Sequence, residues 1–583
     1  MTRRLFLFKN SHNLKKRGVL LKDRLLIFVG TGLILTYLLP NHYPPWASFH
    51  ADALAGVAFI PLLIWVLWQR DAIVPPLALG ALVFALVPLL QLSAGQIGFA
   101  GDAVIASLYI AGFALAVLCG GRIVGKQKSS DSLIQLAPIQ AALVLSGLLS
   151  TGIALHQWLN LGLLAIFIVE LPTGYRPFAN LAQPNQLATL LMLGLMAILF
   201  LYEAKIVRGS VALLTTLVIS FGLAMTQSRT VLLCSIVIWI AYFFLRKRAA
   251  LRLTPVALAL PTLLFLSCVW AWPSINDFLL LPRDGSLAER MRENLRVTLW
   301  RSMIDALERR PWTGYGWNQI ALAQQATALE YPATHWWFES AHNAVLDLAL
   351  WAGLPIAILS TGGVLLWLKR RVAACRDPLT WSLLVGISMV FCHAMVEYPL
   401  AYAYFLLPVG LFMGALDSNV TGRNRQLSAP RIVPAVIGTI AIATFAKVVT
   451  EYVALEEEWR NVRMERTFAG GAIASPATNI VLLTQLKARA QFARLNPTRG
   501  MPPDQLDWMR RVSERYPNVT FMLPYARAAA MNDQSEVAST VLAKICKMQS
   551  SYVCRQTLKE WADFGYSKAA VSGVTASPEG QLH

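Results

Sequence analysis

Histidine is scarce in this sequence, so each one can be weighed as a candidate catalytic group. The chain has eight histidines, and His342 is distinguished by its place, between a long polar stretch and the start of an apolar segment. A neutral imidazole in such a place can accept a proton from a hydroxyl near pH 7. The alternative is an interfacial histidine that helps to cap a helix. Position alone leaves both interpretations open.

Arginine supplies the second set of candidates. Arg229 lies at a tight turn between two apolar segments, where a guanidinium is costly unless it is paired. Arg290, Arg292 and Arg296 lie in the long polar stretch before His342, with the last two four residues apart on one helical face. A planar guanidinium binds two phosphate oxygens at once, so these residues suit a diphosphate. For the three in the polar stretch, a solvated basic helix, or one resting on anionic lipid, is at least as good an interpretation.

Motifs for metal or nucleotide chemistry are missing from the sequence. It contains no His-Glu-x-x-His and no Cys-x-x-Cys, and no Asp-x-Asp pair in the stretches expected on the outer face. Gly314-Tyr315-Gly316 lacks the strand–helix context of a nucleotide-binding loop. We therefore expect chemistry that needs no metal and no cofactor.

The composition identifies the elements that must position these residues. Of 583 residues, 56% are hydrophobic and only 14% are charged, whereas soluble proteins carry roughly 25% charged residues. Repeated apolar runs of about 20 residues, with 18 tryptophans, predict an all-α polytopic membrane protein. The net charge of +19 is spread in short blocks between these runs. Such blocks are typical of topology signals and not of nucleic-acid binding.

Thirteen apolar segments are expected to cross the membrane. Their approximate ranges are 25–40, 52–69, 72–92, 104–120, 132–154, 186–203, 209–226, 230–245, 253–271, 343–368, 380–396, 402–416 and 433–450. Alternate loops between them are rich in Lys and Arg, while the short loops at 41–51, 93–103 and 397–401 have neither. Cytoplasmic loops retain positive charge, so this alternation predicts a cytoplasmic N-terminus and an outer C-terminal region.

Three parts follow from this map. Residues 1–24 form a basic cytoplasmic tail, residues 25–450 a transmembrane catalytic domain, and residues 451–583 an outer soluble domain. Two longer loops of the membrane domain, about 155–185 and about 272–342, lie on the same outer face. The last part is polar with helical patterning, broken at Asn496-Pro497, Pro502-Pro503 and Asn532-Asp533. Short helical hairpins resembling tetratricopeptide units are expected there.

Two of the seven cysteines, Cys546 and Cys554, lie in the outer soluble part. A disulfide between them is feasible if that compartment is oxidising. The bridge requires Cα atoms within about 7 Å, which the spacing does not decide. The other five fall in or beside apolar segments, where cysteine behaves as a small apolar residue.

Several strings, taken together and in order, resemble a known superfamily. The N-terminal strings, the string ending at Gln186 and those around His393 resemble bacterial protein O-oligosaccharyltransferases, the PglL-like pilin glycosylases. Those from Arg296 to Asn343 resemble the wider O-antigen ligase and polymerase superfamily. The strings are Leu39-Pro40-Asn41-His42-Tyr43-Pro44-Pro45-Trp46 with Phe49 and Asp52, Gly101-Asp102-Ala103 with Ser107-Leu108-Tyr109, Arg176-Pro177-Phe178-Ala179-Asn180-Leu181-Ala182-Gln183-Pro184-Asn185-Gln186, Arg296-Val297-Thr298-Leu299-Trp300, Pro311-Trp312-Thr313-Gly314-Tyr315-Gly316-Trp317, His342-Asn343, His393 with Glu397-Tyr398-Pro399-Leu400, and Tyr402-Ala403-Tyr404-Phe405-Leu406-Leu407-Pro408.

The resemblance implies a transferase of the bacterial inner membrane that needs no metal. Such enzymes move an oligosaccharide as a block from undecaprenyl diphosphate to a serine or threonine hydroxyl of a pilin or another periplasmic protein. Arg229 and Arg296 would then hold the diphosphate, with Arg290 and Arg292 in reserve. His342 would be the general base or would orient the acceptor hydroxyl. The sequence departs from the family pattern at Ser340, where many relatives carry a second histidine.

The remaining polar residues of these strings are expected to contact the glycan or the acceptor. This set comprises Asn180, Gln183, Asn185, Gln186, Asn343, Glu397 and Tyr398. For Glu397 and Tyr398, anchoring of a helix end is an equal alternative.

Other functions remain open at this point. Within the same chemistry, an O-antigen polymerase would use a growing glycan as acceptor, and an O-antigen ligase would use the lipid A core. A transporter of lipid-linked saccharide belongs to another class, but it would show repeated halves and ionisable residues inside several spans. A structural membrane protein with a docking domain would leave the arginines and His342 without a role.

Overall fold

The computed structural model describes residues 2–69, 73–125, 130–162, 166–281, 295–421, 427–428, 432–467 and 479–564. Almost all of its regular structure is helical. The helices are α1 (Thr2–Leu38), α2 (Phe49–Trp68), α3 (Pro76–Phe84), α4 (Val87–Ser93), α5 (Ala100–Val124), α6 (Ala137–Trp158), α7 (Pro184–Glu203), α8 (Gly209–Thr226), α9 (Arg229–Leu245), α10 (Pro255–Phe278), α12 (Leu295–Arg309), α13 (Ile320–Thr327), α14 (Ala344–Ala352), α15 (Leu354–Ala374), α16 (Pro378–Ala394), α17 (Ala403–Thr421), α18 (Ile432–Thr467), α19 (Thr484–Ala493), α20 (Pro503–Arg515), α21 (Val519–Met531), α22 (Ser535–Met548) and α23 (Ser551–Asp563). Two 3₁₀ helices, Ser130–Leu136 and Pro399–Ala401, and one antiparallel pair of two-residue strands, β1 (Ile73–Val74) and β2 (Leu427–Ser428), complete the description.

The structure is helical and contains several long apolar helices, as the sequence predicted for a polytopic membrane protein. Among the described residues, eight helical stretches are long and apolar enough to cross a membrane, and three shorter apolar helices accompany them. The eight are Phe49–Trp68, Pro76–Ser93, Ala100–Val124, Ser132–Trp158, Pro184–Glu203, Gly209–Thr226, Pro255–Phe278 and Ile432–Glu465. The count of thirteen spans stays a prediction.

One predicted span is divided in the structure. The expected segment at 343–368 forms α14 and α15, with Gly353 between them at φ +83°. A side chain at Gly353 would overlap the backbone of Trp312, so only glycine fits this close approach. The apolar pattern could not reveal this break, because the sequence is apolar both before and after Gly353.

The described residues form two compact units. Unit 1 comprises those within 1–85, 108–292 and 363–445, and unit 2 those within 86–107, 293–362 and 446–583. Unit 2 therefore includes the described residues 295–342 of the polar stretch before His342 as well as the C-terminal helices. The domain boundary near residue 450 stays a prediction.

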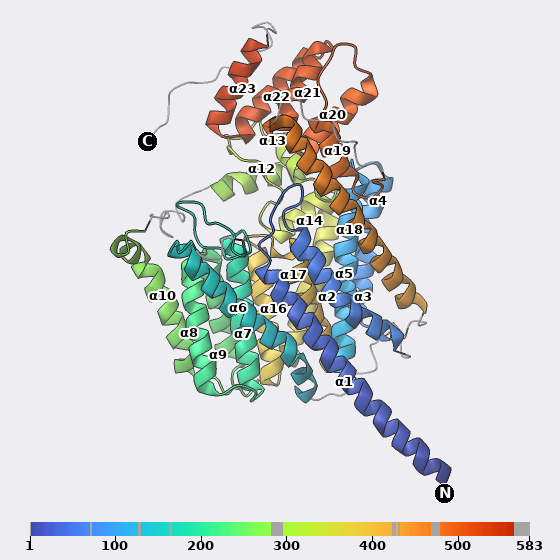
Figure 1. Cartoon of the computed structure of the whole chain (residues 1–583), viewed down its shortest axis with the longest axis vertical. Coiled ribbons are helices and arrows are strands. Elements are labelled where there is room, and N and C mark those ends of the chain that lie inside the picture. The colour runs from blue at the N-terminus through green and yellow to red at the C-terminus, as the bar shows by residue number, and fades with distance from the viewer. Residues whose placement is uncertain are drawn as a thin grey trace. The chain divides into compact units, whose positions relative to one another are not determined.

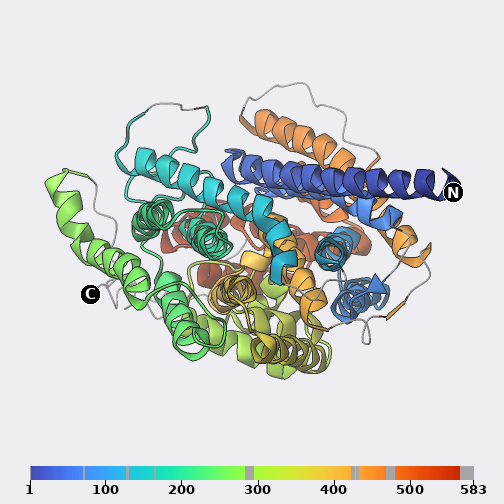
Figure 2. The ribbon, with the colours of Figure 1, turned by 90° about the horizontal axis from the view of Figure 1, so that it is seen from below.

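The core of unit 1 is a helical bundle around α7. This helix packs against α6, α8 and α16 (Figure 1). Of its apolar stretch, 83% is buried inside the protein, the largest share among the eight candidate spans. Helix α9 packs on α16, and helix α1 packs on α2 and α6. Figure 2 shows helices of this bundle end-on. A central helix with an apolar surface all round is expected to be buried by its neighbours.

Unit 2 is built from short amphipathic helices. In the orange-to-red part of Figure 1, α20 packs on α21, α21 on α22, and α22 on α23. Helix α20 begins at Pro503 and α21 ends at Met531, so the predicted breaks at Pro502-Pro503 and Asn532-Asp533 are confirmed. Asp102, in the first turn of α5, forms an ion pair with Arg515 at 2.9 Å, which joins α5 to the end of α20. Whether these helices are tetratricopeptide-like stays a prediction.

Candidate functional site

In unit 1, the N-terminal ends of α7 and α9 are joined by a direct hydrogen bond. Ser228, which precedes α9, donates from Oγ to Oδ1 of Asn185 in the first turn of α7, at 2.8 Å. A serine in this position normally caps its own helix. Here the Ser228 side chain makes no such cap and holds the two helix ends together instead.

Several positive groups lie at this junction. Each helix N-terminus carries roughly half a positive charge, and exposed backbone N–H groups there bind anions. Arg229 is the first residue of α9 and is partly buried, so its guanidinium adds a full charge to this end of the helix. Arg176 lies close by and donates from Nη1 to the carbonyl oxygens of Thr226 and Gln227, at 3.0 and 3.3 Å. It thereby satisfies carbonyl groups at the C-terminal end of α8.

A buried carboxylate completes the junction. Asn185 donates from Nδ2 to Oε1 of Glu397 at 2.7 Å, and Glu397 is only 4% exposed. One turn earlier, at the end of α16, His393 is 1% exposed, and its Nδ1 and Oγ1 of Thr189 on α7 hydrogen-bond each other. Asn185 thus connects the starts of α7 and α9 to the end of α16, which gives it a central place in this unit.

A column of tyrosines continues from Glu397. Tyr398 stacks on Tyr402 with ring centroids 5.9 Å apart, and Tyr402 stacks on Tyr404 at 5.3 Å. Tyr404 donates from its hydroxyl to Oε1 of Gln186 at 2.8 Å, while Gln186 donates from Nε2 to Oε1 of Gln183 at 3.1 Å. The buried Gln186 is therefore bound within the protein by both ends of its amide.

Asn180 is committed to the protein backbone. It is 1% exposed, its two amide hydrogens go to the carbonyl oxygens of Leu38 and Phe167, both at 2.7 Å, and its Oδ1 accepts from the amide of Val169 at 3.1 Å. Its own carbonyl accepts from Nε2 of His42 at 2.6 Å. Burial outweighs this bond and lowers the pKa of His42 below its ordinary value. Asn180 joins three loop segments, and a sugar hydroxyl could not reach its amide without breaking these bonds.

In unit 2, His342 is held by a compact network immediately before α14. Its amide donates to Oγ of Ser340 at 2.9 Å, and Ser340 donates to Oδ2 of Asp347 at 2.6 Å. Asp347 also accepts from the amide of Ala341 at 2.6 Å and interacts electrostatically with His342. The imidazole is partly buried and meets the ring of Phe338 edge-on, with centroids 5.9 Å apart.

The backbone of His342 has an uncommon conformation. Its φ is +55°, in the left-handed region that few residues other than glycine and asparagine adopt. The neighbouring residue, Asn343, caps α14 by accepting from the amides of Val345 and Leu346, both at 3.1 Å. Trp300 on α12 fixes the preceding residue by donating to the carbonyl of Ala341 at 2.8 Å. The backbone of His342 is thus fixed both by the residue before it, Ala341, and by the residue after it, Asn343.

The remaining predicted residues are placed as follows. Arg296 lies in the first turn of α12 in unit 2 and is partly buried, whereas Arg290 and Arg292 lie outside the described residues. Cys546 and Cys554, at the end of α22 and the start of α23, are joined by a disulfide with Cα atoms 4.7 Å apart. Within the described parts of the chain, no three His, Cys, Asp or Glu side chains are grouped as metal ligands.

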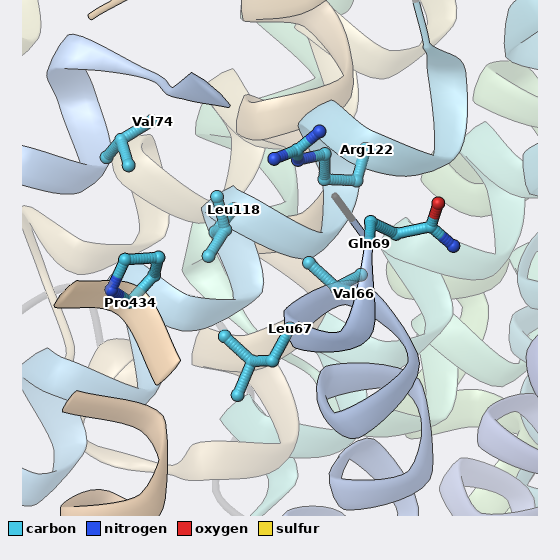
Figure 3. A pocket seen from close by; sticks show the side chains of 7 residues that line it. All are labelled: Val66, Leu67, Gln69, Val74, Leu118, Arg122 and Pro434. Atoms are coloured by element: carbon cyan, nitrogen blue, oxygen red, sulfur yellow. The ribbon is translucent and has the colours of Figure 1, made fainter. Parts of the chain in front are cut away.

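A small cavity in unit 1 is separate from this junction. It is bordered by the C-terminal ends of α2 and α5, with Gln69 and Arg122 as its polar residues (Figure 3). It has room for about one water molecule, with a volume of 10 Å³. A lipid diphosphate cannot enter a space of this size.

Three protein-family models match the chain in succession. Protein glycosylation ligase matches residues 177–202, O-antigen ligase matches 213–361, and the C-terminal part of virulence factor membrane-bound polymerase matches 379–552. A general O-oligosaccharyltransferase of Acinetobacter baylyi is 28% identical over 92% of this chain and 94% of that protein. The chain is therefore similar to O-oligosaccharyltransferases over nearly all of its length and to O-antigen ligases over residues 213–361. A ComP-specific O-oligosaccharyltransferase of the same organism is 25% identical over 66% of this chain and 69% of that protein.

The superfamily matches cover both groups of residues described above. Asn185 and the start of α7 lie within the glycosylation ligase match, and Arg229, Arg296 and His342 lie within the O-antigen ligase match. Glu397 lies within the polymerase match.

Sequence reasoning missed three residues that the structure places in these networks. Ser228 directly precedes α9, where capping explains a serine without further contacts. Thr189 lies within α7, where a bond from its hydroxyl to the carbonyl of Asn185 explains it locally. Asp347 is the acidic residue in the first turn of α14, and a first-turn aspartate is common for electrostatic reasons. The occurrence of an aspartate in an otherwise apolar segment was the signal that could have singled it out.

Proposed function

We propose that this protein is an O-oligosaccharyltransferase of the bacterial inner membrane. It moves an oligosaccharide as a block from undecaprenyl diphosphate to a serine or threonine hydroxyl of a pilin or another exported protein. The observation that carries the proposal is the junction of the α7 and α9 N-termini at Asn185, Ser228 and Arg229, an anion-binding arrangement in a membrane-embedded unit. The names of the two Acinetobacter relatives support protein as the acceptor.

The diphosphate of the donor binds through Arg229 and the positive end of α9. Its charge grows as the bond to the sugar breaks, and a guanidinium held beside a helix N-terminus stabilises that charge without reorganisation. Arg296 contributes a second guanidinium, with Arg290 and Arg292 in reserve. Because these groups supply the charge stabilisation, the reaction needs no metal ion.

His342 acts on the acceptor hydroxyl. Its neutral imidazole removes the hydroxyl proton as the acceptor oxygen forms a bond to the sugar, and undecaprenyl diphosphate leaves. Asp347 is a positioning residue, because it fixes Ser340 and Ala341 and thereby the backbone that presents His342. The negative charge of Asp347 also stabilises the imidazolium that forms.

We propose fewer glycan-contacting residues than the sequence suggested. Asn185, Gln183, Glu397 and Tyr398 remain candidates, since Asn185 and Glu397 belong to the junction and the other two are their near neighbours in sequence, Gln183 directly before α7 and Tyr398 directly after Glu397. Three others serve the fold: Asn180 joins loops, Gln186 binds Tyr404 and Gln183, and Asn343 caps α14.

The location follows the predicted topology. The N-terminal tail (1–24) is cytoplasmic, thirteen spans lie within 25–450, and the helices of 451–583 form a periplasmic domain. The disulfide between Cys546 and Cys554 supports this orientation, because disulfides persist in the oxidising periplasm and not in the cytoplasm.

Intact mass of an exported acceptor tests the proposal. The host is a bacterium that makes a lipid-linked oligosaccharide but has no ligase of its own, and it expresses a pilin together with this protein. We expect a glycan-sized increase in pilin mass with the unmutated protein and with His156→Ala, a control histidine of α6. With His342→Ala we expect normal membrane insertion and no increase, because the proton acceptor is missing.

The other superfamily activities give different products in the same host. Longer glycan ladders on lipopolysaccharide would indicate a polymerase, and newly capped lipid A core would indicate a ligase. Either product, with an unmodified pilin, would overturn protein glycosylation. Normal pilin modification by His342→Ala would remove His342 from the mechanism.

A further inference from the structure

The loop that leads to His342 is attached to the connection between α22 and α23. His335 donates from its amide to the carbonyl of Lys547 at 3.1 Å and from Nδ1 to the carbonyl of Gln549 at 3.2 Å. Lys547 returns a bond from Nζ to the carbonyl of Tyr331 at 3.0 Å. The three bonds fix both ends of the segment from Tyr331 to His335, seven residues before His342.

The partners of His335 lie within a closed covalent ring. Lys547 and Gln549 stand between Cys546 and Cys554, which are joined by the disulfide. We name residues 546–554 the anchor turn. Ser550 caps α23 inside it by accepting from the amide of Val553, and Gln549 donates from Nε2 to the carbonyl of Pro517 at 2.7 Å. The ring therefore holds the two carbonyl groups that His335 uses in a defined position.

Two further attachments hold the loop between His335 and His342. Gln324 on α13 donates to the carbonyl of Trp336 at 3.0 Å and accepts from the amide of Phe338 at 3.0 Å. Asp347 then binds Ser340 and Ala341. His335, Gln324 and Asp347 thus fix successive segments of the one loop that leads to His342, and the attachment at His335 is the first of the three along the chain.

We propose that the Cys546–Cys554 disulfide and His335 are positioning groups for His342. The inference rests on the proposed function, in which His342 removes the acceptor proton. The disulfide keeps the anchor turn closed, the anchor turn holds His335, and His335 sets the path of the loop. When a dithiol reductant gives two electrons and two protons to the disulfide, the two thiols separate and the anchor turn opens. The reductant is oxidised to a disulfide. The enzyme still binds its substrates, but His342 is no longer held in the position from which it removes the acceptor proton.

The first measurement is amide hydrogen exchange on the full chain in lipid nanodiscs, without substrates. We compare the unmutated protein with Cys546→Ser/Cys554→Ser. We expect faster exchange in peptides covering 331–342, because the amide of His335 loses a fixed partner. Exchange in α20 and α21 should stay unchanged, which separates release of the loop from general destabilisation of the unit.

The second measurement is the rate of glycan transfer by the same two proteins. We expect kcat to fall at least about tenfold in the double serine variant with unchanged KM for the lipid-linked donor, because misplaced catalytic groups slow the reaction without weakening binding. Reductant should lower kcat of the unmutated protein and leave the double variant unaffected, which assigns the effect to this disulfide. Reoxidation should restore the activity.

His335 provides an independent variant that leaves the disulfide intact. His335→Ala removes the bond from Nδ1 to the Gln549 carbonyl and should lower kcat in the same direction. His335→Asn should recover part of the loss, because asparagine tolerates the φ of +54° at this position and supplies a side-chain donor.

The outcomes distinguish this inference from the proposed function. Unchanged exchange at 331–342 in the double serine variant would overturn the anchoring role, and faster exchange with unchanged kcat would overturn the positioning role. A loss confined to KM for the donor would also overturn it. An unmutated protein that transfers no glycan would refute the proposed function, while the exchange measurement would still decide whether the disulfide holds the loop.

Discussion

At the scale of single residues, the two central groups occupy very different settings. Arg229 stands at the first position of a helix, where its charge adds to the positive end of that helix. His342 stands in a loop at φ +55°, where three hydrogen-bonded neighbours define its backbone. The position of Arg229 suits electrostatic binding, and the position of His342 suits a side chain whose orientation must be fixed.

The proposed role of Arg229 depends on the planar geometry of the guanidinium group as well as on its charge. We expect Arg229→Lys to reduce transfer roughly 100-fold, because an ammonium cannot make the paired bonds of a guanidinium to two phosphate oxygens. Arg208→Lys, at an exposed position before α8, is the matched control and should be near normal. The measurement is binding of the lipid-linked donor together with its rate of transfer. Unchanged affinity and rate in Arg229→Lys would show that this residue does not hold the diphosphate.

At the scale of elements, the polar residues near the start of α7 divide into two classes. Asn180 precedes the helix and joins three loop segments through the backbone, whereas Asn185 lies in its first turn and links α9 with Glu397. The sequence presents them as equal members of one motif. Their contacts show that one holds the loop in place and the other faces the junction.

Asn180→Ala and Asn185→Ala should therefore differ in their effect on transfer. We expect Asn180→Ala to cost about 1–3 kcal/mol of stability, since it leaves partly buried backbone groups without this partner, and to retain transfer per folded molecule. Asn185→Ala also removes a partner of the buried Ser228 and Glu397, so it should cost stability too, but it should lose most of its transfer per folded molecule. Thermal unfolding in detergent and transfer per folded enzyme are the two measurements. Full stability with lost donor binding in Asn180→Ala would restore this residue to the glycan site.

At the scale of the whole molecule, the sequence predicted the class, the apolar helices and the family more readily than the roles of individual polar residues. Hydropathy is a property of long segments, so α7 and α8 could be located within two residues of their observed starts. Two of the partners of Asn180, Leu38 and His42, lie 142 and 138 positions away in sequence, and no local pattern reveals them. The break at Gly353 was missed for the same reason, because it depends on contact with Trp312.

The predicted orientation of the whole chain can be tested with fused reporters. An alkaline phosphatase domain is active only after export, so we expect activity when it follows the C-terminus. A fusion at Ile206, between α7 and α8, should be inactive, because the predicted thirteen spans place this loop inside the cell. Activity at Ile206, or none at the C-terminus, would contradict the orientation and would place the proposed reaction on the wrong side of the membrane.

The attachment between His335 and Gln549 also has a consequence for the order of synthesis, since it joins residues 214 positions apart. At roughly 5–20 residues per second, a ribosome makes the loop about 10–40 s before it makes the residues that hold it. The chain therefore emerges with its His342 loop lacking this one attachment and acquires it only when its last helices are made. Premature termination anywhere before α22 would leave an inserted protein whose loop never receives that anchor.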